Sequence, residues 1–137
     1  MTWLQWALLS ALFAGLTAVL AKVGVKDVDA NLATAIRTAV ILVLTWAIAF
    51  ARSTQDLTQV PGRAYVFLII SGLATGASWL CYFHALQLGE VSRVAPIDKL
   101  SVVFAMVLAV LFLGESISIR HCLGAACIVA GSLILAR

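Results

Sequence analysis

Five apolar stretches, each close to the ~20 residues that cross the hydrocarbon core of a bilayer, dominate this 137-residue chain. They cover residues 2–21, 31–51, 64–88, 94–113 and 119–136. Lipid offers no hydrogen bonds to the backbone, so each stretch must be a helix or part of a closed barrel. Barrel strands alternate polar and apolar residues, and no such alternation is present. The sequence therefore predicts an all-α integral membrane bundle of five transmembrane helices.

The composition excludes a water-soluble fold. Hydrophobic residues make up 64% of the chain and charged residues only 11%, whereas a soluble domain has about 25% charged residues. The net charge of +3 is spread along the chain without a basic run, so no nucleic-acid partner is expected. The expected surroundings are a lipid bilayer, with the chain as a multi-pass protein of the plasma (inner) membrane.

Signals for catalysis and metal binding are absent from the sequence. No HExxH, GxSxG or P-loop motif occurs, and only two histidines are present to act as bases. Cys81, Cys122 and Cys127 lie in apolar stretches without a CxxC pair or a histidine at metal-ligand spacing, and we interpret them as small core residues. We expect no enzyme, no cofactor and no metal site.

The loops carry too few charges to fix an orientation. Five helices would place the termini on opposite sides of the membrane. Lys and Arg then number three on the N-terminal side and four on the other, with Arg37 and Lys99 inside helices. The positive-inside rule gives no firm orientation from this difference. Two interpretations stay open: the near-balance is noise, or the chain inserts both ways and pairs head to tail.

Polar residues set the expected helix ends. Residues 22–29 form the first loop, 52–63 the only long linker, and 89–93 a tight turn. Gly114 and Glu115 end the fourth helix. Two serines are candidate N-caps of the fifth helix, namely Ser116 and Ser118.

Charged residues within the predicted helices are the first candidates for function. Arg37 lies roughly 9 Å into the second helix, and Asp98 and Lys99 lie roughly 6–8 Å into the fourth, entering from the same side. Intramembrane charge is usually paired or turned toward a cavity. We therefore hypothesise a gate or coupling site of these three residues, with Asp98 paired to Arg37 or near Lys99. The alternative is that Arg37 and Lys99 snorkel to the interface.

Pro96 is expected in the first turn of the fourth helix, where proline is tolerated. The alternative is that it loosens the turn that presents Asp98.

A polar and aromatic stripe follows one face of the third helix. Ser71, Thr75, Ser78, Trp79 and Tyr82 recur at spacings of three and four. In lipid such a stripe must face other helices or a wet cavity. We predict that Thr75, Ser78, Trp79 and Tyr82 bind a small-molecule substrate, with plain helix packing as the alternative.

Two glycines on the fifth helix, Gly124 and Gly131, are seven residues apart and share a face. Small residues at this spacing let a neighbouring backbone approach closely. We predict a dimer seam here, with packing inside one subunit as the alternative.

A series of motifs follows along residues 82–136: Tyr82 with Ala85 and Leu86, Pro96, Leu113–Gly114–Glu115, and the glycines Gly124 and Gly131. In their order and spacing the chain resembles the EamA domain of the drug/metabolite transporter superfamily, most strongly over these residues. Arg37 also matches an arginine common in that family's second helix. The resemblance covers the whole chain and implies one EamA-like transmembrane domain, 1–137, that transports a small metabolite.

Most transporters of that family carry two inverted five-helix repeats, and this chain carries one. The resemblance therefore implies an antiparallel homodimer that works by alternating access. The glycine seam looks like the dimer seam of small multidrug-resistance transporters. Those proteins place a glutamate in the first helix, where this chain has only Gln5, Ser10 and Thr17 as polar side chains. The alternative function is a non-transporting subunit that packs against a larger or paralogous membrane partner.

Overall fold

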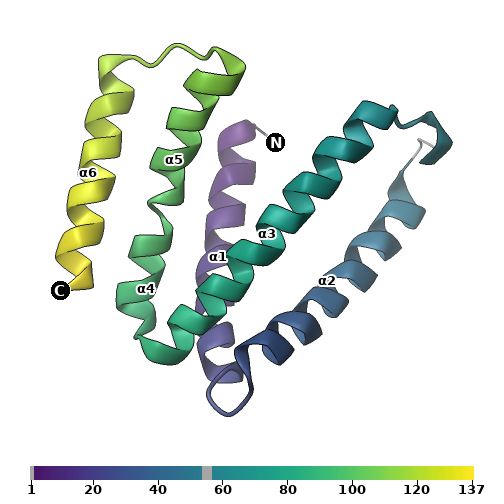
Figure 1. The fold of residues 1–137 in the computed structure, drawn as a ribbon, viewed down its shortest axis with the longest axis horizontal. Helices are drawn as coiled ribbons and strands as arrows, with labels where there is room; N and C mark the ends of the chain where they lie inside the picture. The colour runs from purple at the N-terminus through teal and green to yellow at the C-terminus, as the bar shows by residue number, and fades with distance from the viewer. Residues whose placement is uncertain (1, 54–56) are drawn as a thin grey trace. The chain divides into compact units, whose positions relative to one another are not determined.

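A computed structural model describes residues 2–53 and 57–137 of the chain. Within these ranges, five helices are long and apolar enough to cross a membrane, which confirms the predicted all-α membrane fold (Figure 1). Residues 54–56 of the predicted linker lie outside the described residues. The chain forms two compact units, one made of the residues up to Leu20 with Leu88–Arg137 and the other of Ala21–Gln87.

The first three helices agree closely with the predicted stretches. α1 ends three residues later than predicted, so Lys22 lies in its last turn and not in the loop. α2 begins where the Asp29 carboxylate accepts hydrogen bonds from the N–H groups of Asn31 and Leu32, at 2.9 and 3.1 Å. This cap satisfies donors that a helix start leaves without partners. The elements are α1 (Trp3–Gly24), α2 (Ala30–Arg52), the 3₁₀ turn η1 (Leu57–Gln59) and α3 (Gly62–Leu88).

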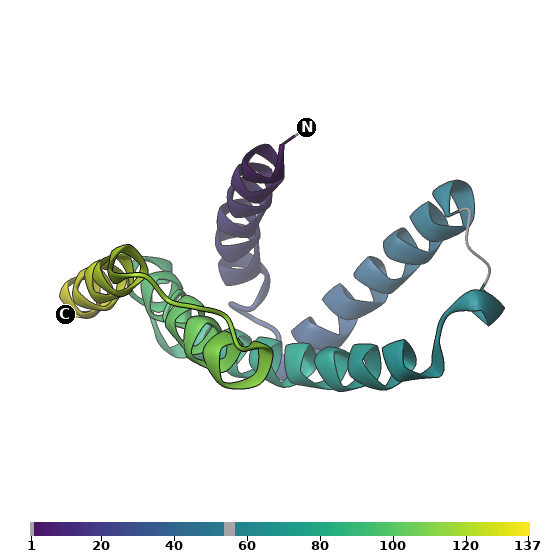
Figure 2. The same cartoon turned by 90° about the horizontal axis from the view of Figure 1, so that it is seen from above.

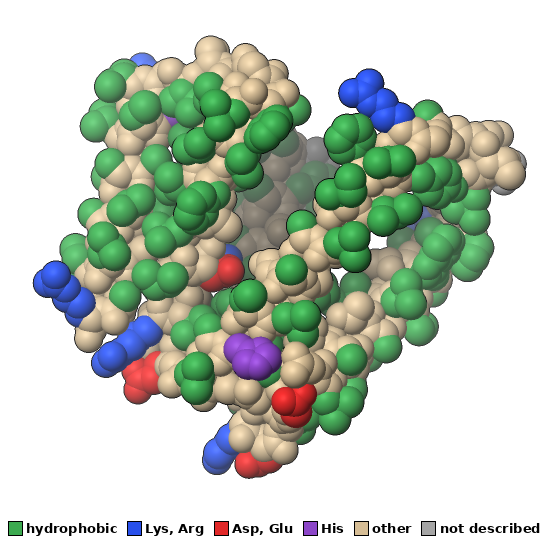
Figure 3. All heavy atoms as spheres, viewed as in Figure 1, with side chains coloured by type: hydrophobic (Ala, Val, Ile, Leu, Met, Phe, Trp, Pro, Cys, Tyr) green, Lys and Arg blue, Asp and Glu red, His purple; other side chains and the backbone are tan. Residues whose placement is uncertain are grey.

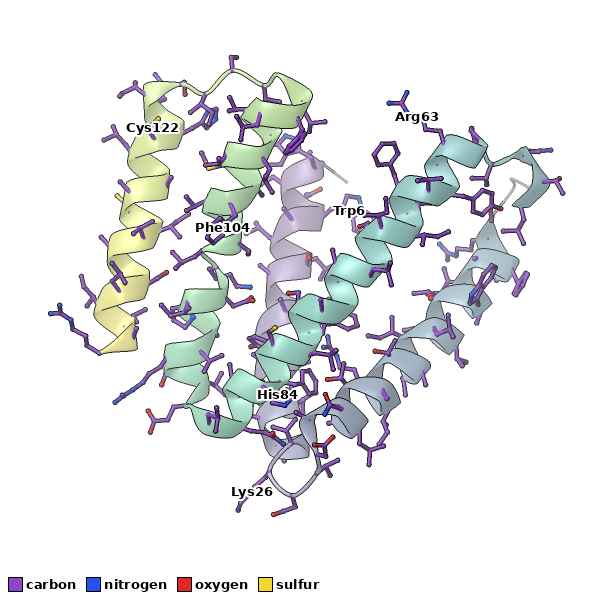
Figure 4. All side chains as sticks on the ribbon, viewed as in Figure 1. Trp6, Lys26, Arg63, His84, Phe104 and Cys122 are labelled. Carbon is purple, nitrogen blue, oxygen red and sulfur yellow. The ribbon has the colours of Figure 1, made fainter. Side chains whose placement is uncertain are left out.

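Polar contacts to backbone carbonyls close one end of the unit Ala21–Gln87. The side-chain amide of Gln87 donates to the carbonyls of Val28 at 2.7 Å and Val25 at 3.4 Å. The Lys22 ammonium donates to the carbonyl of Leu86. The end of α3 is therefore tied to the α1–α2 connection, near the labelled Lys26 and His84 in Figure 4. The buried apolar residues of this unit gather in the same segments: Ala21, Val25, Ala30, Phe83 and Leu86.

The fourth span, Val91–Leu113, is a broken helix. It consists of α4 (Val91–Asp98), α5 (Ser101–Leu108) and a short π-helical turn, η2 (Ala109–Leu113). The last helix, α6 (Ile119–Ala136), has the predicted bounds and packs along α4 and α5 (Figures 1 and 2).

The early start of α4 corrects two predictions. α4 begins at Val91 after an N-cap at Glu90, so the predicted turn at 89–93 is shorter and Arg93 is helical. Pro96 is consequently the sixth residue of α4 and not part of its first turn. Inside a helix, proline has no N–H to donate and its ring crowds the carbonyl four residues earlier. The helix ends two residues later, at Asp98, in agreement with the alternative that Pro96 loosens the turn presenting this carboxylate.

Tight turns continue the chain through this break. The N–H of Lys99 bonds the carbonyl of Pro96 at 3.1 Å, and the N–H of Leu100 bonds that of Ile97 at 3.0 Å. Both bonds span three residues instead of the four of an α-helix. The fourth span therefore changes helical geometry beside its charged pair, Asp98 and Lys99.

The two sides of the α5–α6 connection follow the predicted signals. Gly114 ends η2 with φ of +66°, a left-handed conformation that favours glycine. Ser118 is the N-cap of α6, and its backbone N–H donates to the ring of His121 at 3.2 Å, forming a capping box. Of the two candidate serines, Ser118 is thus the cap.

Most of the apolar surface of the spans is uncovered within the chain. The buried share runs from 0% of the fourth span to 11% of α1. On the face shown in Figure 3, hydrophobic side chains cover the helix sides and most charged ones lie near helix ends. Cys81, Cys122 and Cys127 are also exposed, so their interpretation as core residues is wrong within a single chain. Lipid or another protein must cover these surfaces.

We predict that Gln87→Ala loosens the connection between α1 and α2. The lost hydrogen bonds are worth about 1 kcal/mol, so backbone amides of residues 25–29 should exchange with deuterium roughly five- to tenfold faster. Hydrogen exchange with mass spectrometry in detergent micelles measures this. The control is His84→Ala, because His84 is exposed on the same helix. Equal exchange in both variants would contradict the role given to Gln87.

Candidate functional site

Arg37 is stacked on aromatic rings in the unit Ala21–Gln87. The guanidinium carbon lies 4.2 Å from the centroid of the Trp79 ring and 5.5 Å from that of Phe83. Arg37 is the eighth residue of α2, about 10 Å along the helix from its start. The side chain is half-buried against α3. The side chain therefore lies against another helix of its own unit, and its role at a gate stays a prediction.

The spacing of the aromatic residues on α3 explains this arrangement. Trp79 and Phe83 are four residues apart and therefore lie on the same helix face. Tyr82 lies between them in the sequence and is half-buried. Phe83 is only 3% exposed. The Arg37 guanidinium thus contacts two rings that are one turn apart on the same face of α3.

The predicted substrate residues of α3 fall into two groups. Trp79 and Tyr82 are half-buried, whereas Thr75 and Ser78 are exposed. The Thr75 hydroxyl donates to the carbonyl of Ser71 at 2.9 Å, within its own helix. The role of these four residues in substrate binding stays a prediction.

One small pocket of this unit lies away from that stripe. It has a volume of about 160 Å³ and is lined by Lys22, Val25, Lys26, Leu86 and Gln87. These are largely the residues that close the end of the unit. We therefore assign the pocket to that closure and not to the substrate stripe.

Asp98 and Lys99 lie at the break of the fourth span. Asp98 is the last residue of α4, and its carboxylate is 3.4 Å from the Lys99 ammonium. This contact agrees with the option that Asp98 sits near Lys99. Because Arg37 belongs to the other unit, the Arg37–Asp98 pair stays a prediction.

Ser132 supports this break from α6. Its side chain is buried, and its hydroxyl donates to the carbonyl of Pro96 at 2.8 Å. The carbonyl of Pro96 thereby accepts both this bond and the N–H of Lys99. Ser132 therefore fixes the last turn of α4 against the last helix.

The glycines of the predicted seam are open within the chain. A Cβ atom added at Gly124 or Gly131 would meet no atom within 4 Å. Within the unit that contains α6, no other helix therefore packs closely on these two positions. The dimer seam at these glycines stays a prediction.

The sequence reasoning missed Phe83 and Ser132. The signal for Phe83 was available, because it lies four residues after Trp79 and extends the stripe by one helical turn. Ser132 could not be recognised from the sequence, where it is a lone serine in the apolar run GSLIL. A serine in a membrane helix often donates to a carbonyl of its own helix, so its presence alone does not indicate a contact with another helix. The partner of Ser132, the carbonyl of Pro96, becomes visible only once α6 is packed on α4.

Comparison with known proteins identifies the family. The model of the EamA-like transporter family matches residues 1–137. The chain belongs to the EamA-like transporter family. A relative from Sinorhizobium sp, named an uncharacterized transporter in the cobO 3′ region, is 55% identical over 136 residues. The alignment covers 98% of this chain and 96% of the relative. No solved structure matches the chain.

Membership in the EamA-like family confirms the resemblance found in the sequence. Together with the five apolar helices, it supports a multi-pass membrane transporter and not an enzyme. Since the relative is covered almost throughout, it too has the length of one five-helix repeat.

We predict that Ser132→Ala destabilises the packing of α6 on α4. A hydrogen bond between membrane helices is worth about 0.6 kcal/mol on average and up to about 1.7, so the free energy of unfolding should fall within that range. Titration of the micelle-bound protein with SDS, followed by circular dichroism, measures the change. Ser101→Ala is the matched control, because Ser101 is exposed on α5. A loss of the same size in the control would remove Ser132 from the account.

Proposed function

We propose that the chain is one half of an alternating-access transporter for a small metabolite, and that a second copy in the opposite orientation supplies the other half. Inverted repeats with a substrate site between them are a common plan of secondary transporters. In an antiparallel homodimer, each copy places its charged residues Arg37, Asp98 and Lys99 toward one side of the membrane. Two symmetry-related gates then flank a central cavity, and exchange of the two subunit conformations opens the cavity to each side in turn.

The observation that carries the proposal is the broken fourth span. Transporters build substrate sites from discontinuous helices, because the ends of the half-helices expose backbone groups and place charges at membrane depth. Here the break lies at Asp98–Leu100 and is held by Ser132. We assign Arg37, Asp98 and Lys99 to the gates. The cavity is assigned to Trp79 and Tyr82, with Thr75 and Ser78.

Three further observations support a second copy in this role. The spans are almost unburied within one chain, the α6 glycines are open, and the relative has a similar length. In lipid, small residues allow close helix contact without a hydrophobic driving force. Gly124 and Gly131 are therefore the proposed centre of the dimer seam.

The near-balance of flanking charges fits insertion in both orientations. If a single chain inserted one way only, its inverted partner would have to be another protein. The alternative function, a subunit that packs on a larger or paralogous partner, would then apply.

We predict dual orientation in the native membrane. Two reporters should be fused to the C-terminus in turn, one active only outside the cell and one only inside, and both should be active. Single added charges should shift the ratio in opposite directions, because each side carries only three or four cations. Suitable variants are Ser116→Lys in the α5–α6 connection and Asp27→Lys in the α1–α2 connection. Activity of one reporter alone would contradict the homodimer and favour the partner-dependent subunit.

A further inference from the structure

Arg37 is a charged group inside a membrane span whose contacts do not neutralise its charge. The ion pairs in the described part of the chain are Glu90–Arg93 and Asp98–Lys99, and neither includes Arg37. Its neighbours are aromatic rings, at 4.2 and 5.5 Å from the guanidinium carbon. Ring faces attract a cation but do not cancel its charge. In membrane proteins such cations usually meet an anion or a set of carbonyls.

The acidic residues of the described chain have other surroundings. The Asp29 carboxylate caps the start of α2. Glu90 contacts Arg93 at 3.5 Å, and Asp98 contacts Lys99 at 3.4 Å. Asp27 in the α1–α2 connection and Glu115 in the connection before α6 are both exposed. These local arrangements leave the anion for Arg37 to come from outside the unit.

The geometry of the cluster fits an anionic group. Arginine has a planar guanidinium, and its five N–H donors point outward in that plane. The Arg37 guanidinium carbon lies over the rings of Trp79 and Phe83. Within the described residues its N–H groups donate no hydrogen bond, so they stay available for a bidentate carboxylate or phosphate. The rings offer an apolar surface to the body of the same ligand, as aromatic pockets do for small molecules.

We propose that Arg37, supported by Trp79 and Phe83, binds the carboxylate or phosphate group of the transported solute, which is a small organic anion with an apolar body. This inference rests on the proposed transport function and names its substrate class. The same anionic chemistry is offered by a lipid headgroup, and the experiment separates the two sources. Trp79 is both part of the site and its natural fluorescent reporter.

The test uses the full chain with Trp79 as its only tryptophan. The other three tryptophans are replaced by phenylalanine, at Trp3, Trp6 and Trp46. The protein is reconstituted in phosphatidylcholine vesicles and titrated with 3-phenylpropionate. Matched probes are the neutral 3-phenylpropionamide and the cationic 3-phenylpropylamine. We expect a saturable change of Trp79 emission with the carboxylate and an affinity for the amide that is at least about tenfold lower.

Two arginine variants provide the matched comparison. Arg37→Gln should abolish the response to 3-phenylpropionate, and Arg37→Lys should keep a weaker one, because lysine retains the charge but lacks the fork. Arg63 offers a control, since its guanidinium carbon also lies near an aromatic ring, 5.6 Å from the centroid of Phe67. In this case the arginine and the ring belong to the same helix. Arg63→Gln should leave the titration unchanged. Circular dichroism verifies that each variant is folded.

Several results would overturn the inference. They are equal affinity for carboxylate and amide, no saturable response to the carboxylate, or an unchanged response in Arg37→Gln. A response lost when phosphatidylglycerol replaces half of the phosphatidylcholine would assign the site to a lipid headgroup. If Trp79 emission responded to 3-phenylpropionate only in Asp98→Asn, the Asp98 carboxylate would be the anion that pairs with the Arg37 guanidinium.

The equilibrium titration does not require transport, so the two proposals fail separately. The transport function would be contradicted if the protein bound the carboxylate but moved neither 3-phenylpropionate nor any other organic anion across the vesicle membrane. Transport of a neutral or cationic solute by a protein that does not bind the carboxylate would overturn only the substrate class.

Discussion

Hydrogen bonding in lipid governs this protein more than side-chain burial does. The bilayer forces every backbone group into a helix, but it does not drive apolar helices together, because lipid tails are as apolar as leucine. A few polar contacts therefore hold the units: Gln87 and Lys22 at the α1–α2 connection, and Ser132 at the break of the fourth span. The rest of each helix is left uncovered and available to lipid or to a second protein.

The same constraint marks where function resides. A membrane helix keeps its regular hydrogen bonds and avoids charge unless a site requires otherwise. This chain departs from both rules in two places. The fourth span is broken beside Asp98 and Lys99, and α2 carries Arg37 over the ring of Trp79. Each departure costs stability unless the charged groups find polar or aromatic partners, and the proposed transport path between two copies would supply further polar surroundings.

Length and hydrophobicity were enough to predict all five spans, because a lipid-facing segment has few structural options. The break was only an alternative in the sequence, since the predicted helix began at residue 94 and Pro96 was expected in its first turn. α4 begins instead at Val91, after an N-cap at Glu90 whose side chain makes no cap hydrogen bond, and Pro96 is therefore inside the helix. Arg37 and Trp79 were found from charge and spacing. Their contact was not, because it depends on the rotation of α2 about its own axis. The bond from Ser132 depends likewise on the packing of α6.

The central claim is that a second copy of the chain completes the transporter. Its most direct test is the mass of the protein released from lipid nanodiscs by native mass spectrometry, with Gly124→Leu and Gly131→Leu as variants that fill the proposed seam. The account predicts a complex of twice the 14.5 kDa chain, and loss of that complex in the variants. A wild-type mass of one chain, or a complex that contains a different protein, would contradict the claim.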